Sequence, residues 1–511
     1  MRKGEILMAE KNPISRRRFL AAAASAEAVM LVPRSVLGGA GGVSPNDKLQ
    51  LGCIGVGAQG TRVMMDFLKR PDVQVVSVCD VNQESDDYSE WGENELRNKA
   101  VELVGSGFHY PNSGSRGGVA GREPARRIVE GVYAKEKTSG AYKGCTAYQD
   151  FREMLESEKN LDAVAVCTPD HAHAVISISA MKKGKHVYCQ KAMCRTLHEA
   201  RRMAETTQDT KTATQVAVGN HASEATRLLC EWIWDGAIGA VREVHNWSSR
   251  PLWPQGHDRP EKGEPVPPGL DWNLWVGPSP ERPYHSVYLP FIWRGWRDFG
   301  TGALGDMGCY SFDTIFRVLK LTSPVCVEAS PNHEYRVERG VSKMKKHPET
   351  YPHASIVRFH FPARESMPPV TLHWYDGGIL PSRPEELGDA QPFENEGMLF
   401  VGDKGKILCQ FTGSDPKLIP EAKMKAYKQP PKTLPRSVGH YQEWIDACKG
   451  GSSAGADFTF TARVTETLLL GNLALCADKS FLRWEGATMK SPDLPDADAY
   501  VNPPYRSGWS L

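Results

Sequence analysis

A glycine-rich turn carries the clearest chemical signal in the sequence. The pattern G-x-G-x-x-G follows the apolar run Leu49–Gly55 and opens a helical stretch at Thr61. Glycines at these positions allow a tight turn and let backbone N–H groups approach a pyrophosphate at the helix N-terminus. The pattern predicts a dinucleotide site that includes Gly55, Gly57, Ala58, Gln59 and Gly60.

An acidic residue follows at the spacing that such a site requires. Asp80 lies 20 residues after Gly60 and ends a second apolar run, Val73–Cys79. A carboxylate there accepts hydrogen bonds from ribose hydroxyls and repels a 2′-phosphate. Val81 and Asn82 follow it, with no adjacent arginine, so NAD is favoured over NADP. The alternative is a structural glycine turn with Asp80 as a helix cap.

Polar residues end two further apolar runs. Because ligands of open α/β sheets bind at the carboxyl ends of the strands, we expect these residues to contact the cofactor: Thr168, Pro169, His173, Gln190 and Lys191. Lys191 is the candidate to face the nicotinamide ring. For His173 alone, a helix-capping or surface role is the alternative.

A third group of polar residues has helical spacing. Asp306, Tyr310 and Asp313 share one face if Met307–Leu319 is a helix. Oxidation of a secondary alcohol needs a base for the hydroxyl proton and a donor for the developing alkoxide. We expect Lys191 to be the donor and to lower the pKa of Tyr310, so that the phenol becomes a better base. Alternatively, Asp306 is a helix N-cap and Tyr310 a core aromatic.

Aromatic residues concentrate in one segment. Eight of the 13 tryptophans fall between Trp232 and Trp296, with arginines among them. Aromatic faces beside polar side chains suit a sugar, although packing in a small core or an oligomer surface is the alternative. The candidate substrate residues are His221, Trp247, Arg250, Trp253, Trp293, Trp296 and Asp313. No C-x-x-C pair occurs and no metal site is predicted.

Alternating apolar and helical stretches must position these residues. Residues 44–218 predict an α/β fold, a doubly wound parallel sheet of the Rossmann type, with a long insertion at 84–145. We expect the glycine tract Ser113–Gly121 of the insertion to be a loop. Residues 219–511 predict an α+β domain whose strands are mostly antiparallel: Val241–Ser248, Ser355–Phe361, Val370–Tyr375, Met398–Val401 and Lys406–Gln410.

Composition and the N-terminal residues indicate which partners and which cellular location to expect. The chain has 511 residues, 24% charged residues and a net charge of +1, which gives no reason to expect nucleic acid or an anionic membrane as a partner. Ser15–Leu20, with Arg16 and Arg17, precedes an alanine-rich stretch and predicts a twin-arginine signal over residues 1–43. We expect a periplasmic or otherwise exported enzyme that holds its cofactor tightly. A basic helix or disordered tail is the alternative.

Taken in order, the motifs resemble those of the Gfo/Idh/MocA family, named for glucose–fructose oxidoreductase and inositol dehydrogenase. Beside the glycine turn, Thr168–His173 resembles T-P-x-x-x-H, His186–Lys191 resembles H-V-x-x-E-K-P, and Asp306–Asp313 resembles D-x-x-x-H-x-x-D. The resemblance implies a Rossmann domain followed by an open, mostly antiparallel sheet. It implies that Lys191 contacts the reacting hydroxyl and that Asp306 and residue 310 form the acid/base pair.

The same resemblance implies the activity. We expect an NAD-dependent oxidoreductase acting on a secondary hydroxyl of a sugar, inositol or glycoside, assembled as a dimer or tetramer. One alternative is a redox-neutral glycosidase that oxidises C3 and then eliminates the leaving group. Another is a non-catalytic sugar-binding relative, because Gln190, Ala192 and Tyr310 replace the family's glutamate, proline and histidine.

Overall fold

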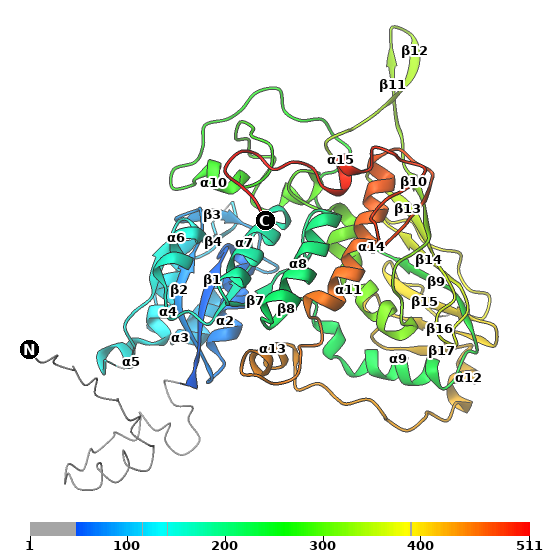
Figure 1. The fold of residues 1–511 in the computed structure, drawn as a ribbon, viewed down its shortest axis with the longest axis horizontal. Coiled ribbons are helices and arrows are strands. Elements are labelled where there is room, and N and C mark those ends of the chain that lie inside the picture. Colours follow the sequence, from blue (N-terminus) through cyan, green and yellow to red (C-terminus); the bar gives the residue numbers. More distant parts are fainter. Residues whose placement is uncertain (1–46, 115, 141, 389–390) are drawn as a thin grey trace, which may run out of the picture. The chain divides into compact units, whose positions relative to one another are not determined.

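Six strands form a parallel sheet in the order β5-β2-β1-β6-β7-β8 (Figure 1). The computed structural model describes residues 47–511 except 115, 141 and 389–390, so the predicted signal segment lies outside the described residues. Apolar residues fill both faces of the central strands, as helices on both sides of a parallel sheet require. The strands are β1 (Leu49–Ile54), β2 (Val73–Cys79), β5 (Thr146–Tyr148), β6 (Ala163–Val166), β7 (His186–Cys189) and β8 (Thr214–Val216).

This order confirms the predicted Rossmann sheet. The chain runs outward from β1 through β2 to β5 and then returns to β6 on the other side of β1. The point at which the strand order reverses therefore lies between β1 and β6. Open α/β sheets bind ligands at this crevice. The flanking helices are α2 (Ala58–Leu68), α6 (Phe151–Ser157), α7 (Asp170–Lys182) and α8 (Leu197–Thr210).

The insertion between β2 and β5 has its own secondary structure. The prediction that the glycine tract is entirely loop is wrong, because Gly118–Ala120 forms β4 and pairs antiparallel with β3. This two-stranded ribbon places Tyr88 beside the glycine turn, where a Cβ on Gly57 would come within 2.7 Å of the tyrosine ring. The elements are β3 (Ser85–Tyr88), α3 (Glu95–Val104), β4 (Gly118–Ala120), α4 (Arg122–Val132) and α5 (Ala134–Thr138).

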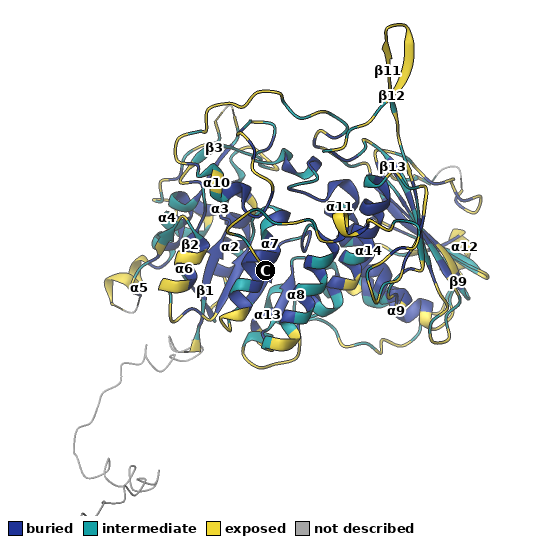
Figure 2. Cartoon of the chain, turned by 45° about the horizontal axis from the view of Figure 1, so that its top comes forward, coloured by how far each residue is buried: buried dark blue, intermediate teal, exposed yellow. Residues whose placement is uncertain are grey.

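The second sheet has eight strands in the order β17-β16-β15-β9-β14-β13-β10-β18. Its pairs are antiparallel except β9 with β14, which confirms the predicted mostly antiparallel sheet. Figure 2 shows the exposed β11–β12 hairpin projecting from this part of the molecule. The strands are β9 (Val241–Trp247), β10 (Cys326–Pro331), β11 (Glu334–Glu338), β12 (Val341–Lys345), β13 (Ser355–Phe361), β14 (Val370–Tyr375), β15 (Gly397–Gly402), β16 (Gly405–Cys409), β17 (Lys417–Ile419) and β18 (Phe481–Arg483).

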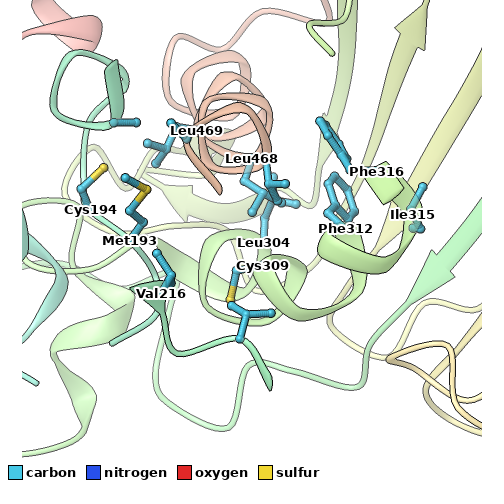
Figure 3. Close-up of a cluster of buried hydrophobic side chains, with 14 of the residues drawn as sticks. Met193, Cys194, Val216, Leu304, Cys309, Phe312, Ile315, Phe316, Leu468 and Leu469 are labelled. Atoms are coloured by element: carbon cyan, nitrogen blue, oxygen red, sulfur yellow. The ribbon is translucent and has the colours of Figure 1, made fainter. Parts of the chain in front are cut away.

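Two long helices, α11 (Gly302–Leu319) and α14 (Phe458–Cys476), pack between the sheets. In Figure 3, Leu304 of one helix lies beside Leu468 of the other. Gly308 allows the close approach, since a Cβ there would lie 2.6 Å from the Leu468 side chain. The helices of this region are α9 (Glu224–Trp234), α10 (Trp272–Val276), α11 (Gly302–Leu319), α12 (Glu421–Ala426), α13 (His440–Cys448), α14 (Phe458–Cys476) and α15 (Asp498–Val501), with short 3₁₀ turns at Gly219–Ala222 and Ile292–Gly295.

The start of α11 corrects one expectation. The helix begins at Gly302, not at Met307, and its N-cap is Thr301. Asp306 therefore lies inside the helix and is not its N-cap. This excludes the structural alternative that the sequence had left open for Asp306.

Helix α13 packs on the nucleotide-binding side, although the sequence placed it in the second domain. Trp444 is fully buried, and its ring lies 5.4 Å from that of Phe67 on α2 and 5.6 Å from that of Tyr188 on β7. Residues Leu49–Leu511 accordingly form one unit of structure. Among the described residues, no helix combines the length and apolar character needed to cross a membrane.

Replacing Trp444 with alanine should destabilise the protein by about 3–5 kcal/mol, because it leaves a large cavity among buried aromatic rings. The measurement is the free energy of unfolding from denaturant titration. Trp234→Ala is the matched control, since this ring is 41% exposed and should cost less. Equal losses in the two variants would contradict the packing role of α13.

Candidate dinucleotide and active site

A cavity of about 420 Å³ opens at the carboxyl ends of β1, β2, β6 and β7, beside the first turns of α11. It collects most of the residues that the sequence nominated, from stretches that are far apart along the chain. Those that line it are Gly55, Gly57, Ala58, Gln59, Gly60, Asp80, Thr168, Pro169, Gln190, Lys191, Arg250, Trp253, Trp293, Asp306 and Tyr310.

The glycine turn fits a pyrophosphate. Gly55 has φ +81°, and a Cβ on Gly60 would lie 1.8 Å from the Gly55 carbonyl oxygen, so neither position accepts a side chain. Within the described part of the chain, no side chain caps α2 and no acidic residue occupies its first turn. Its N-terminal N–H groups therefore remain available to an anion, which the helix dipole also favours.

Asp80 lies deep in the cavity next to this turn. Its Oδ1 accepts a hydrogen bond from the Asn82 backbone N–H at 2.8 Å. Burial raises the pKa of Asp80 to about 6, although neighbouring backbone N–H groups and Arg122 oppose the shift. Arg122, from the insertion, donates to the Asp80 carbonyl oxygen at 3.0 Å, a neighbour that the sequence did not predict.

A buried ion cluster forms the other end of the cavity. Lys191 Nζ lies 2.7 Å from Asp306 Oδ1 and donates to the Asp306 carbonyl oxygen at 3.0 Å. Arg294 Nε donates to the same Oδ1 at 3.0 Å. Burial alone would raise the pKa of Asp306, but the two cations outweigh it and lower that pKa. Burial would likewise lower the pKa of Lys191, but Asp306 and its neighbours raise it. Both groups are therefore ionised at neutral pH.

Tyr310 lies beside this cluster but with a different role from the predicted one. Lys191 Nζ lies 5.1 Å from the centre of its ring, a cation–π distance. Burial raises the pKa of Tyr310 and outweighs the opposing effect of Lys191. The expectation that Lys191 lowers the pKa of Tyr310 is wrong, because burial raises this pKa by more than the ammonium lowers it. Tyr310 is a neutral phenol at pH 7, able to donate or accept a hydrogen bond.

Arg294 is one of the arginines of the aromatic segment, which the sequence associated with a sugar, but it was not among the candidate site residues. Its guanidinium lies 4.3 Å from the Trp293 ring, 4.5 Å from that of Phe291 and 5.9 Å from that of Trp253. The arginine thus connects the aromatic wall of the cavity to Asp306. Its place inside the Trp-Arg-Gly-Trp run at 293–296 was a signal that could have been used.

His173 lies behind the cavity and does not line it. Its Nδ1 and Nε2 contact the carbonyl oxygens of Ala192 and Thr168, both at 2.7 Å. Because carbonyl oxygens only accept, both contacts are hydrogen bonds only when both ring nitrogens carry a proton. These contacts, together with Cys189, raise the pKa of His173 against the effect of burial. His173 therefore joins the loops that follow β6 and β7.

Four predicted substrate residues also lie away from the cavity. Trp247 packs against Phe393, with ring centres 4.8 Å apart. Trp296 is buried in a small aromatic core, the alternative noted from the sequence. Asp313 pairs with Arg317 at 2.9 Å, and His221 Nε2 lies 2.8 Å from a Glu443 carboxylate oxygen.

Asp170, at the start of α7, is a second group that the sequence did not nominate. It is fully buried, and its Oδ2 accepts a hydrogen bond from Thr301 Oγ1 at 2.9 Å. Burial, reinforced by the charge of Asp306, raises the pKa of Asp170 to about 7. The contact joins the Rossmann part of the molecule to the N-cap of α11 and so helps to place Asp306.

One group of possible metal ligands lies on the second sheet. Glu243, His245 and His373 have ligand atoms within 4.8 Å of one another. The two imidazole rings are stacked, with centres 4.6 Å apart and planes inclined by 18°. Nitrogen lone pairs lie in the ring planes, so those of stacked rings run side by side and do not converge on one ion. We therefore assign no ion to these three residues.

Sequence profiles of one family match two parts of the chain. The profile described as "Oxidoreductase family, NAD-binding Rossmann fold" matches residues 100–218, and "Oxidoreductase family, C-terminal alpha/beta domain" matches residues 238–357. The chain belongs to the Gfo/Idh/MocA family of oxidoreductases. The first matched range begins after the glycine turn and Asp80, so the assignment of the family does not rest on that motif.

Relatives match shorter segments. The levoglucosan dehydrogenase of Pseudarthrobacter phenanthrenivorans is 31% identical over 110 residues, 20% of this chain and 28% of that protein. A glycosyl hydrolase family 109 protein of Stenotrophomonas maltophilia is 27% identical over 177 residues, 35% of this chain and 29% of that protein. The chain thus matches less than a third of the length of either relative.

A solved structure with a similar fold extends the comparison to most of the chain. The WlbA dehydrogenase from Bordetella pertussis, in complex with NADH and UDP-GlcNAcA, is 14% identical, with a TM-score of 0.50. The likeness covers 86% of this chain and 99% of that one. At this identity it supports the Gfo/Idh/MocA fold and nothing finer.

The raised pKa of Asp80 predicts that NAD affinity depends on pH. Above pH 6 the carboxylate is ionised and accepts from the ribose hydroxyls, whereas below pH 6 it takes up a proton. Affinity measured by calorimetry should therefore fall by up to about tenfold between pH 7.5 and pH 5. Asp80→Asn should bind more weakly at pH 7.5 and lose this dependence; an unchanged pH profile would remove Asp80 from the ribose site.

Proposed function

We propose that this protein oxidises a secondary hydroxyl of a sugar, inositol or glycoside, with NAD held tightly between successive turnovers. The observation that carries the proposal is the buried Lys191–Asp306–Arg294 cluster, which faces the same cavity as the glycine turn and Asp80. NAD bound along that cavity would supply the hydride acceptor, and the chain's own residues would handle the proton and the oxygen.

The charges of the cluster suit an alcohol that becomes a carbonyl. Lys191 and Arg294 carry two positive charges against the single negative charge of Asp306, which leaves a net charge of +1 next to the reacting oxygen. The Lys191 ammonium can donate to that oxygen and lower the cost of an alkoxide. Asp306, which contacts Lys191 and is ionised, is the acceptor for the released proton, while the neutral Tyr310 orients the hydroxyl.

The walls of the cavity favour a carbohydrate. Trp253, Trp293 and Phe291 offer aromatic faces, and Arg250 and Arg294 offer N–H groups between them. A sugar ring has apolar C–H faces and a rim of hydroxyls, so both kinds of surface find a partner. The names of the relatives, a levoglucosan dehydrogenase and a family 109 glycosyl hydrolase, support sugar chemistry.

The proposal is tested by asking what the purified protein carries and what it oxidises. Mass spectrometry after denaturation should release NAD and not NADP, and a screen of sugars, inositols and glycosides should identify one that raises absorbance at 340 nm. Release of an aglycone with no net NADH and with solvent deuterium at C2 would instead favour the redox-neutral glycosidase. Failure to bind either nucleotide would refute the proposal.

Lys191→Met should abolish turnover and leave bound NAD in place, because the thioether keeps the length of the side chain but neither donates nor carries charge. Steady-state kinetics and the amount of co-purified nucleotide check the two halves of this prediction. Lys185→Met, at a lysine outside the cavity, is the matched control and should keep wild-type activity. Full activity in Lys191→Met would exclude the lysine from the reaction.

We also propose that the protein is exported through a twin-arginine signal. Support comes from Arg16 and Arg17 before an alanine-rich stretch. Replacing both with lysine should leave the protein in the cytoplasm of a bacterial host, as judged by cell fractionation. Arg18→Lys, at the neighbouring position, should still be exported; periplasmic accumulation of the double variant would disprove this route.

A further inference from the structure

The cavity continues past Asp80 to an apolar end. The lining residues there include Phe151 at the start of α6, Ile176 on α7 and Leu274 on α10. Strand β5, which leads into α6, lies beyond β2 at the edge of the sheet. If the pyrophosphate lies at the glycine turn and a ribose at Asp80, the base attached to that ribose occupies this end.

Trp509 lines the same end of the cavity. It is separated from Phe151 by more than half of the chain, yet the two ring centres lie 6.3 Å apart with planes inclined by 34°. The Arg152 guanidinium lies 4.9 Å from the Trp509 ring. An aromatic face beside an arginine is a typical surface for stacking a nucleic acid base.

Residues 503–511, which we call the clasp segment, hold Trp509 in position. Arg506 donates from Nη1 to Asn273 Oδ1 at 2.7 Å and from its backbone N–H to the Pro278 carbonyl oxygen at 3.2 Å. Tyr505 donates to Glu199 Oε1 on α8, and Lys182 Nζ on α7 donates to the Leu511 carbonyl oxygen at 2.9 Å. The segment therefore bridges the Rossmann helices and the α10 region.

The segment around α10 also borders this end of the cavity. Asp271 N–H donates to the Val81 carbonyl oxygen at 3.0 Å, directly after Asp80, and Gln149 Nε2 donates to Asp271 Oδ2 at 2.9 Å. These bonds hold Leu270 and Leu274 over the apolar end. Two segments distant in sequence thus cover the place where a Rossmann domain alone would leave the base open to solvent.

We propose that Trp509 is a cofactor-binding residue that stacks on the adenine of NAD, and that the clasp segment must open before the dinucleotide can leave. The inference rests on the proposed function only in that NAD is the ligand. It assigns the retention of the cofactor to contacts on the adenine side, made by residues 503–511 and α10, and not to the reacting end of the cavity.

The direct test is the rate at which NAD leaves the full-length protein. The protein is loaded with NAD⁺ labelled in adenine, freed of excess ligand and chased with unlabelled NAD⁺. Trp509→Ala should lose label about tenfold faster than wild type, the size expected for one lost aromatic–base contact. Trp509→Phe keeps an aromatic face and should fall between the two, and Trp234→Ala, a tryptophan outside the cavity, should match wild type.

A second measurement separates an adenine contact from a general loosening. Trp509→Ala should weaken ADP-ribose by a similar factor and leave the affinity for nicotinamide mononucleotide unchanged; equal loss of both would overturn the inference. Arg506→Met, which frees the clasp segment without removing a side chain that lines the cavity, should also speed release and decides the question if Trp509→Ala fails to fold. Wild-type protein that binds no NAD refutes the proposed function, whereas wild-type release rates in Trp509→Ala and Arg506→Met refute only this inference.

Discussion

The buried contact between Lys191 and Asp306 is the constraint on which the site depends. It joins the end of β7 to the first turns of α11, two elements separated by 115 residues in sequence. Burying three charges carries a large desolvation cost, which is offset here because one carboxylate serves two cations at hydrogen-bond distance. Removing one partner would leave an uncompensated charge, so the cluster fixes the two halves of the molecule to each other.

Hydrogen bonds of Asp170 and His173 also hold the segments around that cluster in place. Thr301, the N-cap of α11, donates to the buried Asp170 at the start of α7. His173 bridges the loops after β6 and β7 through two carbonyl oxygens. None of these contacts lies at a point that a substrate would reach, yet each sets the position of a residue that does line the cavity. The histidine of the T-P-x-x-x-H motif therefore positions neighbouring loops and does not line the cavity.

The departures from the family pattern acquire a physical interpretation. Tyr310 stands where the motif that it resembles has histidine, and burial raises its pKa, which fits the orienting role proposed for its hydroxyl. Arg294, which comes from the aromatic segment, contacts Asp306 and brings a second positive charge to the cluster. The long insertion brings Tyr88 and Trp91 to the cavity, so it helps to build the nucleotide site.

The sequence alone determined the Rossmann sheet, the glycine turn and the partners Lys191 and Asp306, because each follows from local periodicity or from a motif of short span. It also predicted β13 and β14 with their observed bounds. Only the tertiary structure decided which aromatic residues meet the cavity: Trp253 and Trp293 line it, whereas Trp247 and Trp296 pack elsewhere. Arg294, Asp170 and Trp509 acquire their surroundings from distant segments, and such long-range contacts are not encoded in spacing along the chain.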